Sequence, residues 1–97
     1  MKEHFGAAES VVGLVGQLAE RALRAELRSA APDRGMDCFD LKVSLTHQPS
    51  SLEDLRPEAA VIHLGRRTAL GRCTVFTPDG ALVAVVSATY RVAGGNR

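Results

Sequence analysis

Two glutamates and two glycines recur at helical spacing near the amino terminus. Successive spacings of four, three and four residues place them on one stripe of a helix: Glu9, Gly13, Gly16 and Glu20. A glycine inside a helix costs up to about 1 kcal/mol relative to alanine. We therefore expect either another helix or strand, or a ligand, to approach the bare backbone closely at Gly13 and Gly16.

Glu20 has two interpretations. A carboxylate at a partly desolvated interface, with a pKa tuned by burial, could activate water or attack a carbonyl carbon directly. The alternative is a solvated glutamate that pairs with Arg24 one turn later, while the glycines allow a symmetry-related helix or a strand to pack tightly. The residue types leave both interpretations open.

Other candidate site residues lie at strand ends. His47 follows the first predicted strand and could border a site, but a single histidine without a matched partner favours the alternative of an exposed strand-end residue. Arg66 and Arg67 follow Gly65, and guanidinium groups suit phosphate because they present several donors in a planar fork. The alternative for this pair is a solvated turn with a charged edge.

Several classes of site are disfavoured. No second histidine or carboxylate stands at ligand spacing from His4, His47 or His63, so no metal site is expected. Cys38 and Cys73 form no Cys-x-x-Cys pair, and we expect both to be reduced core residues. A net charge of +1, scattered arginines and only four Phe or Tyr residues argue against nucleic-acid binding.

The apolar runs are short. Residues 81–86 form the longest, far below the roughly 20 residues that cross a bilayer, and the amino terminus lacks the order of a secretory signal. We therefore expect a cytoplasmic protein with no membrane partner, formed by 97 residues as one domain.

One helix precedes about four strands. Residues 7–29 show helical periodicity, with an apolar stripe widened by Ala8, Leu14, Ala19 and Ala25 around Val11, Val15, Leu18 and Ala22. Residues 39–45 alternate as a strand, and further strands are predicted at about 58–64, 68–77 and 81–92. Asp79-Gly80 predicts a hairpin between the last two strands. Between the first two, Ser51 and Asp54 could cap one helical turn in a surface excursion.

Residues 61–92, together with the segment from Gly13 to Glu20, resemble hotdog-fold acyl-CoA thioesterases of the phenylacetate-degradation type. The resemblance implies an α+β fold in which one long central helix packs on an antiparallel sheet of four to five strands. It implies at least a homodimer, or a dimer of dimers, with the ligand tunnel between subunits. It also implies hydrolysis of an acyl-CoA or acyl-carrier thioester, with coenzyme A entering as part of the substrate and no separate cofactor.

The resemblance suggests roles for the candidate residues. Glu20 becomes the general base or nucleophile, and amides near Gly13 would polarise the carbonyl as unpaired helix-start groups. Arg66 and Arg67 would lie near the coenzyme A phosphates. The chain departs from the family pattern because only residues 1–10 stand where the family has a strand and a His-Gly-Gly loop. A non-catalytic hotdog module for acyl binding or dimerisation is therefore the alternative.

Overall fold

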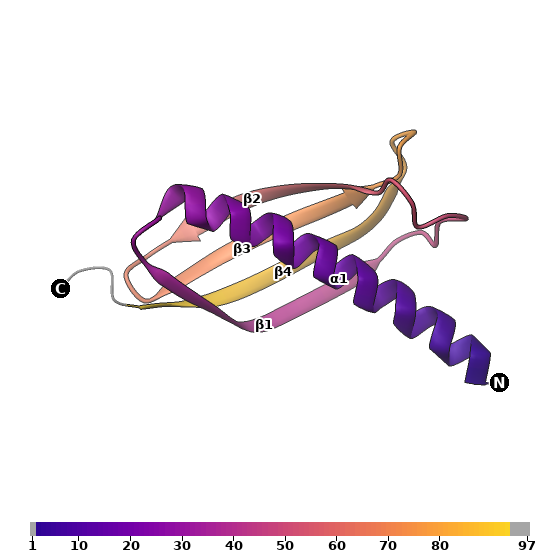
Figure 1. Cartoon of the computed structure of the whole chain (residues 1–97), viewed down its shortest axis with the longest axis horizontal. Helices are drawn as coiled ribbons and strands as arrows, with labels where there is room; N and C mark the ends of the chain where they lie inside the picture. The colour runs from indigo at the N-terminus through magenta and orange to yellow at the C-terminus, as the bar shows by residue number, and fades with distance from the viewer. Residues whose placement is uncertain (1, 94–97) are drawn as a thin grey trace.

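A long helix crosses one face of a four-stranded antiparallel sheet (Figure 1). The computed structural model describes residues 2–93, with side chains from Val11 onward. Its elements are α1 (Lys2–Ala30), β1 (Gly35–Leu45), β2 (Arg56–Leu64), β3 (Thr68–Phe76) and β4 (Leu82–Ala93). The strand order is β1-β4-β3-β2, and every neighbouring pair is antiparallel. The predicted fold class is confirmed, although α1 starts five residues before the predicted boundary.

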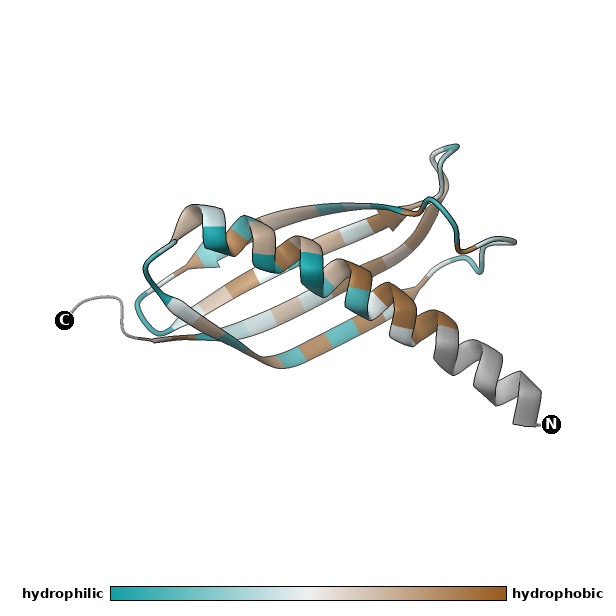
Figure 2. Cartoon of the chain, viewed as in Figure 1, coloured by the Kyte–Doolittle hydropathy of each residue, from teal (hydrophilic) through white to brown (hydrophobic). Residues whose placement is uncertain are grey.

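The core lies between α1 and the two central strands. The helix buries one side chain every four residues: Val11, Val15, Ala19, Leu23, Leu27 and, just after its end, Ala31. The inner face of the sheet contributes alternate positions, among them Ala69, Cys73, Val75, Ala84, Val86, Ala88, Tyr90 and Val92. In Figure 2 the hydrophobic colour recurs along the central strands of the sheet beneath the helix. Burial of this apolar surface is the main favourable term that holds the helix on the sheet.

The predicted apolar stripe of the helix was partly wrong. Leu14 is exposed and Leu18 only partly buried, whereas Leu23 and Leu27, which the prediction left out, are fully buried. The buried positions follow the row of residues spaced by four, which is inclined to the helix axis. A helix that lies across the sheet therefore changes the face it buries along its length. Ala8 lies outside the described side chains.

The predicted hairpin is confirmed. Gly80 adopts a φ of +98°, and the Thr77 amide donates to the Ala81 carbonyl at 2.9 Å. Only glycine adopts that conformation without steric cost. The predicted helical turn after the first strand is absent from the described loop, because the Ser51 hydroxyl accepts from the Glu53 amide at 3.1 Å and forms a tight turn instead.

The outer strands β1 and β2 form the two edges of the described sheet. On β1 the register shifts between Cys38 and Asp40, which is a bulge at Phe39. Beyond the bulge, Leu41 and Leu45 are paired with inward-facing residues of β4, yet they remain 38% and 39% exposed. Within residues 2–93, no helix is long and apolar enough to span a membrane.

Candidate functional site

An open groove of about 460 Å³ separates α1 from the edge strand β1. It is lined by Val12, Gly13, Gly16, Gln17, Glu20, Leu41 and Val43. The helical stripe predicted from the sequence thus faces this groove at Gly13, Gly16 and Glu20. The Glu9 backbone lies in α1, but its side chain is outside the described residues.

The two glycines are not required by the packing of the described chain. A methyl group on Gly16 would lie 3.5 Å from Leu41 Cδ2 and 3.6 Å from Val43 Cγ2, which are ordinary van der Waals distances. A methyl group on Gly13 would meet no described atom within 4 Å. The space over Gly13 is therefore open to a molecule from outside the described chain.

The expectation of free amides near Gly13 does not agree with the helix boundaries. α1 begins at Lys2, so Gly13 and Gly16 lie well beyond its first turn. Only the first four amides of a helix lack a partner within it. Amides at these glycines donate to carbonyls one turn earlier, and the groove gains open space from the glycines rather than hydrogen-bond donors.

Glu20 lies where the groove meets the core. Its Oε2 atom is 2.6 Å from Nε of Arg24, in an ion pair one helical turn apart. The hydroxyl of Tyr90, on β4, donates to the same oxygen at 3.5 Å. The Glu20 side chain is 29% exposed, so it is neither buried in the core nor fully solvated.

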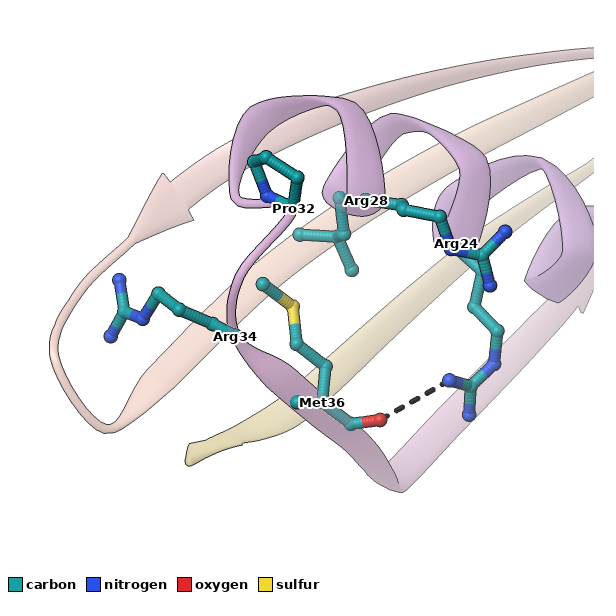
Figure 3. Close-up of a pocket in the computed structure, with 7 residues that line it drawn as sticks. Arg24, Arg28, Pro32, Arg34 and Met36 are labelled. Atoms are coloured by element: carbon teal, nitrogen blue, oxygen red, sulfur yellow. Dashed lines mark hydrogen bonds between the residues drawn. The ribbon is translucent and has the colours of Figure 1, made fainter. Parts of the chain in front are cut away.

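Arg24 connects three elements through one side chain. Besides the Glu20 pair, its NH1 group donates to the Met36 carbonyl of β1 at 3.2 Å (Figure 3). Its guanidinium carbon lies 5.8 Å from the centre of the Tyr90 ring, within the range of a cation–π contact. Arg24 thus holds Glu20 against both β1 and β4.

Burial keeps two neighbouring groups in their neutral forms. Burial, and then the nearby charge of Glu20, raises the pKa of Tyr90 well above its usual range. Burial also raises the pKa of the Cys38 thiol, which donates to the Asp40 carbonyl. Neither group is an anionic nucleophile near neutral pH, so Glu20 is the chemically available group of this cluster.

Arg66 and Arg67 lie in the turn between β2 and β3. Both side chains are exposed, and the turn backbone is fixed because Arg34 NH2 donates to the Gly65 and Arg66 carbonyls at 2.9 and 2.7 Å. The Val92 amide also donates to the Arg67 carbonyl at 2.8 Å. Two guanidinium groups therefore project from an ordered corner.

His47 lies at the other end of the sheet. It follows β1, whose first residue Gly35 pairs with the end of β4 beside the arginine corner. The groove around His47 is lined by loop residues that include Glu53, Asp54 and Asp79. The structure therefore brings Gly13, Gly16 and Glu20 together, and separates His47 from Arg66 and Arg67. Within the described part of the chain, no cluster of three or more His, Cys, Asp or Glu residues could hold a metal.

A smaller pocket of about 240 Å³ lies at the end of α1. Figure 3 shows its lining, which is Arg24, Leu27, Arg28, Pro32, Arg34, Gly35 and Met36. Two of its three arginines are engaged elsewhere, since Arg34 contacts the turn carbonyls and Arg24 contacts Glu20 and Met36. The pocket therefore offers fewer free donors than its composition implies.

Sequence reasoning did not find the role of Tyr90. A single tyrosine stands among valines and alanines on the inward face of β4. A buried tyrosine hydroxyl usually has a hydrogen-bond partner. The position of Tyr90 therefore could have indicated a polar side chain on the helix that faces it. Arg34 was missed for a different reason, because no local pattern relates it to a turn 31 residues later.

No protein-family model matches this sequence, and no curated protein matches it. Several solved structures are similar to this chain. An X-ray structure of a protein from the thioesterase superfamily is 30% identical, with a TM-score of 0.74 over 84% of this chain and 60% of that one. A Bacillus halodurans protein crystallised with CoA is 22% identical, with a TM-score of 0.76 over 84% of this chain and 57% of that one.

A third structure, a thioesterase from Haemophilus influenzae, is 16% identical, with a TM-score of 0.62 over 97% of this chain. The chain spans between 57% and 61% of the length of these three structures. The arrangement of one helix on a four-stranded antiparallel sheet is therefore the hotdog fold, and two of these structural neighbours are a protein of the thioesterase superfamily and a thioesterase.

Proposed function

We propose that this chain hydrolyses an acyl thioester of coenzyme A, or of an acyl carrier, in the groove between α1 and β1. The observation that carries the proposal is the position of Glu20, a carboxylate that lines an otherwise mostly apolar groove beside two glycines. The apolar walls suit an acyl group, and the open space over Gly13 admits the thioester. The hotdog fold and its thioesterase-superfamily neighbours support the same reaction class.

The reaction needs one base. The Glu20 carboxylate takes a proton from water as the water oxygen attacks the carbonyl carbon, and the carbon–sulfur bond then breaks. The thiolate of the leaving group takes up the proton, so the products are a carboxylic acid and a thiol. In the alternative route the Glu20 carboxylate attacks the carbonyl carbon, the carbon–sulfur bond breaks and the thiolate leaves, and water then cleaves the resulting mixed anhydride to release the carboxylic acid and restore the Glu20 carboxylate. In both routes the protein must keep Glu20 ionised and directed toward the groove.

The arginine corner would bind the phosphates of the coenzyme A part. Arg66 and Arg67 project from a turn whose backbone is held by hydrogen bonds from Arg34, so the backbone positions of the two arginines are fixed. One structural neighbour was crystallised with CoA, which makes this ligand a reasonable candidate here. As the resemblance to hotdog thioesterases implies, we place the coenzyme A phosphates and the acyl group of one ligand on opposite sides of a subunit boundary.

A second copy of the chain would complete the groove. Its open side lies next to the edge strand β1, where Leu41 and Leu45 stay more than a third exposed, and Leu14 of the helix is also exposed. A homodimer, or a dimer of dimers, would cover this apolar surface, as in the phenylacetate-degradation type that the sequence resembles. The arginine corner of one subunit would then serve the groove of the other.

One observation favours a non-catalytic role, either acyl-ligand binding or dimerisation. The ion pair between Glu20 and Arg24 at 2.6 Å occupies one carboxylate oxygen and resembles a structural helix pair. In this alternative the groove holds an acyl group or a partner helix, and Glu20 only orders the helix surface.

The test is release of thiol from a panel of acyl-CoA thioesters of different acyl length and of aromatic acyl type. The proposal expects at least one substrate to be hydrolysed faster than in buffer. Rates equal to buffer for every substrate, together with binding of an acyl-CoA, would support the non-catalytic alternative. Replacing Arg66 and Arg67 by glutamine should raise KM for the same substrate and leave kcat unchanged, because the phosphates lie far from the reacting carbon.

A further inference from the structure

Tyr90 is unusual in its surroundings. It is fully buried on the inward face of β4, between Ala88 and Val92, and it is the only tyrosine of the chain. A phenylalanine would bury the same ring without a polar atom. The hydroxyl donates to Oε2 of Glu20, 70 residues away in the sequence, which among the described residues is the only carboxylate that lines the groove.

Arg24 contacts the same Glu20 oxygen. Its Nε atom is 2.6 Å from Oε2 of Glu20, and its guanidinium lies over the Tyr90 ring. The contact with the Met36 carbonyl fixes the far end of the guanidinium against β1. The planar fork of an arginine therefore has three separate partners, and its orientation is set by the fold rather than by Glu20 alone.

Arg24 and Tyr90 both donate to the same oxygen of the Glu20 carboxylate, Oε2. No described residue donates a hydrogen bond to Oε1 of Glu20, whereas Oε2 accepts from both Arg24 and Tyr90. We propose that Arg24 and Tyr90 are positioning residues that hold Glu20 through Oε2 and direct Oε1 to the reacting water or thioester carbon. This inference rests on the proposed function and names the residues that prepare its base.

The arrangement has a chemical consequence. Two donors on one oxygen fix the orientation of the Glu20 carboxylate relative to the groove. A free side chain would instead rotate among several conformations and present either oxygen. Fixing one oxygen removes that freedom before substrate binds, which is the usual means by which supporting residues raise kcat rather than lower KM.

The contact can be measured without activity. The chain contains one tyrosine and no tryptophan, so its ultraviolet emission reports Tyr90 alone. A carboxylate that accepts a hydrogen bond from a phenol quenches its emission. Glu20→Gln should therefore brighten the tyrosine emission of the folded protein, while Glu26→Gln, a change at an exposed glutamate of the same helix, should not. Equal emission from the wild type and Glu20→Gln would overturn the contact.

Kinetics then test the positioning role. Tyr90→Phe and Arg24→Gln should each lower kcat by about tenfold or more with KM nearly unchanged. Arg24→Lys should recover part of the loss, and Arg21→Gln, on the exposed side of the helix, should have no effect. A kcat for Tyr90→Phe and Arg24→Gln equal to that of Arg21→Gln, at equal folded fraction by circular dichroism, would overturn the role.

The two hypotheses fail in different ways. If the native protein hydrolyses no thioester, the proposed function is refuted and the positioning role falls with it, although the emission experiment still decides whether the Tyr90–Glu20 contact exists. If the native protein is active and Glu20→Gln is inactive, while Tyr90→Phe and Arg24→Gln remain fully active, the proposed function stands and only the positioning inference is refuted.

Discussion

The helix α1 has two faces that meet the sheet differently. One face buries Val15, Ala19, Leu23 and Leu27 at 0–1% exposure against the inner face of the sheet. The other face presents two glycines, Glu20 and exposed Val12 to an open groove beside the edge strand β1. Both faces belong to one continuous helix, so the difference lies in what covers them. The first face is completed by this chain, and the second is left accessible to a ligand or a second copy.

The largest difference between the faces should appear when leucines are truncated. Leu23→Ala should lower the free energy of unfolding by about 2–5 kcal/mol, because Leu23 is fully buried and its removal leaves a cavity. Leu41→Ala, at a residue that is 38% exposed, should cost about 1 kcal/mol or less. Urea unfolding followed by circular dichroism measures both. Equal losses would mean that the groove is packed as tightly as the core.

The second prediction concerns a substitution that adds a methyl group to the core. Gly71→Ala should destabilise the fold by about 1–3 kcal/mol, because the new Cβ would lie 2.6 Å from Leu23 Cδ2 on the opposite helix. The effect should be non-additive with Leu23→Ala, since removal of the leucine creates the space that the methyl group needs. A double variant whose loss equals the sum of the two single losses would contradict this contact.

Tyr90 lies where the two faces meet, and it should make stability depend on alkaline pH. Its pKa is raised above the ordinary value of 10.0, mainly by burial, so its contribution is complete below pH 10 and is lost as the pH rises further. The loss from this group should be about 1 kcal/mol for each pH unit above 10. The raised pKa values of Cys38 and Cys73 add a decline of the same sign above about pH 9.

Unfolding midpoints of the wild type and Tyr90→Phe between pH 8 and 11 measure the tyrosine part. The variant should lose less stability than the wild type above pH 10, while both should show the decline that the thiols cause. Parallel curves over the whole range would place the Tyr90 hydroxyl in a more solvated site than the structure shows.

The smallest expected effect has the opposite sign. Gly13→Ala should raise the free energy of unfolding by about 0.5–1 kcal/mol, because alanine favours the helix and nothing described lies within 4 Å of the new methyl group. The same substitution should raise KM for an acyl-CoA substrate if the bare backbone receives the thioester. A more stable variant with unchanged KM would leave Gly13 without a role in the groove.

Much of the fold followed from local patterns. The last strand was predicted at about residues 81–92 and is observed as Leu82–Ala93, and Asp79-Gly80 predicted the hairpin because only a few residues tolerate its backbone conformation. The buried face of α1 was predicted less well. Periodicity shows that a helix is amphipathic, but the angle at which it crosses the sheet decides whether Leu14 or Leu23 enters the core.

The site was predictable only where its contacts are local. Glu20 and Arg24 are one helical turn apart, so their pairing could be expected from spacing alone. The hydrogen bond from Tyr90 joins residues 70 positions apart, and it depends on β4 being central in the sheet beneath the helix. The prediction of unpaired helix-start amides at Gly13 was wrong for a related reason, because the start of α1 could not be placed accurately from the sequence pattern.

The central claim is that the open face of α1 is a thioester site whose base is Glu20. The most direct test is the kcat for thiol release from the best acyl-CoA substrate, measured for the wild type, Glu20→Gln and the exposed control Glu26→Gln at equal folded concentration. The account predicts a loss of about 10²–10⁴-fold for Glu20→Gln and a wild-type rate for Glu26→Gln. Equal activity of all three proteins would contradict it.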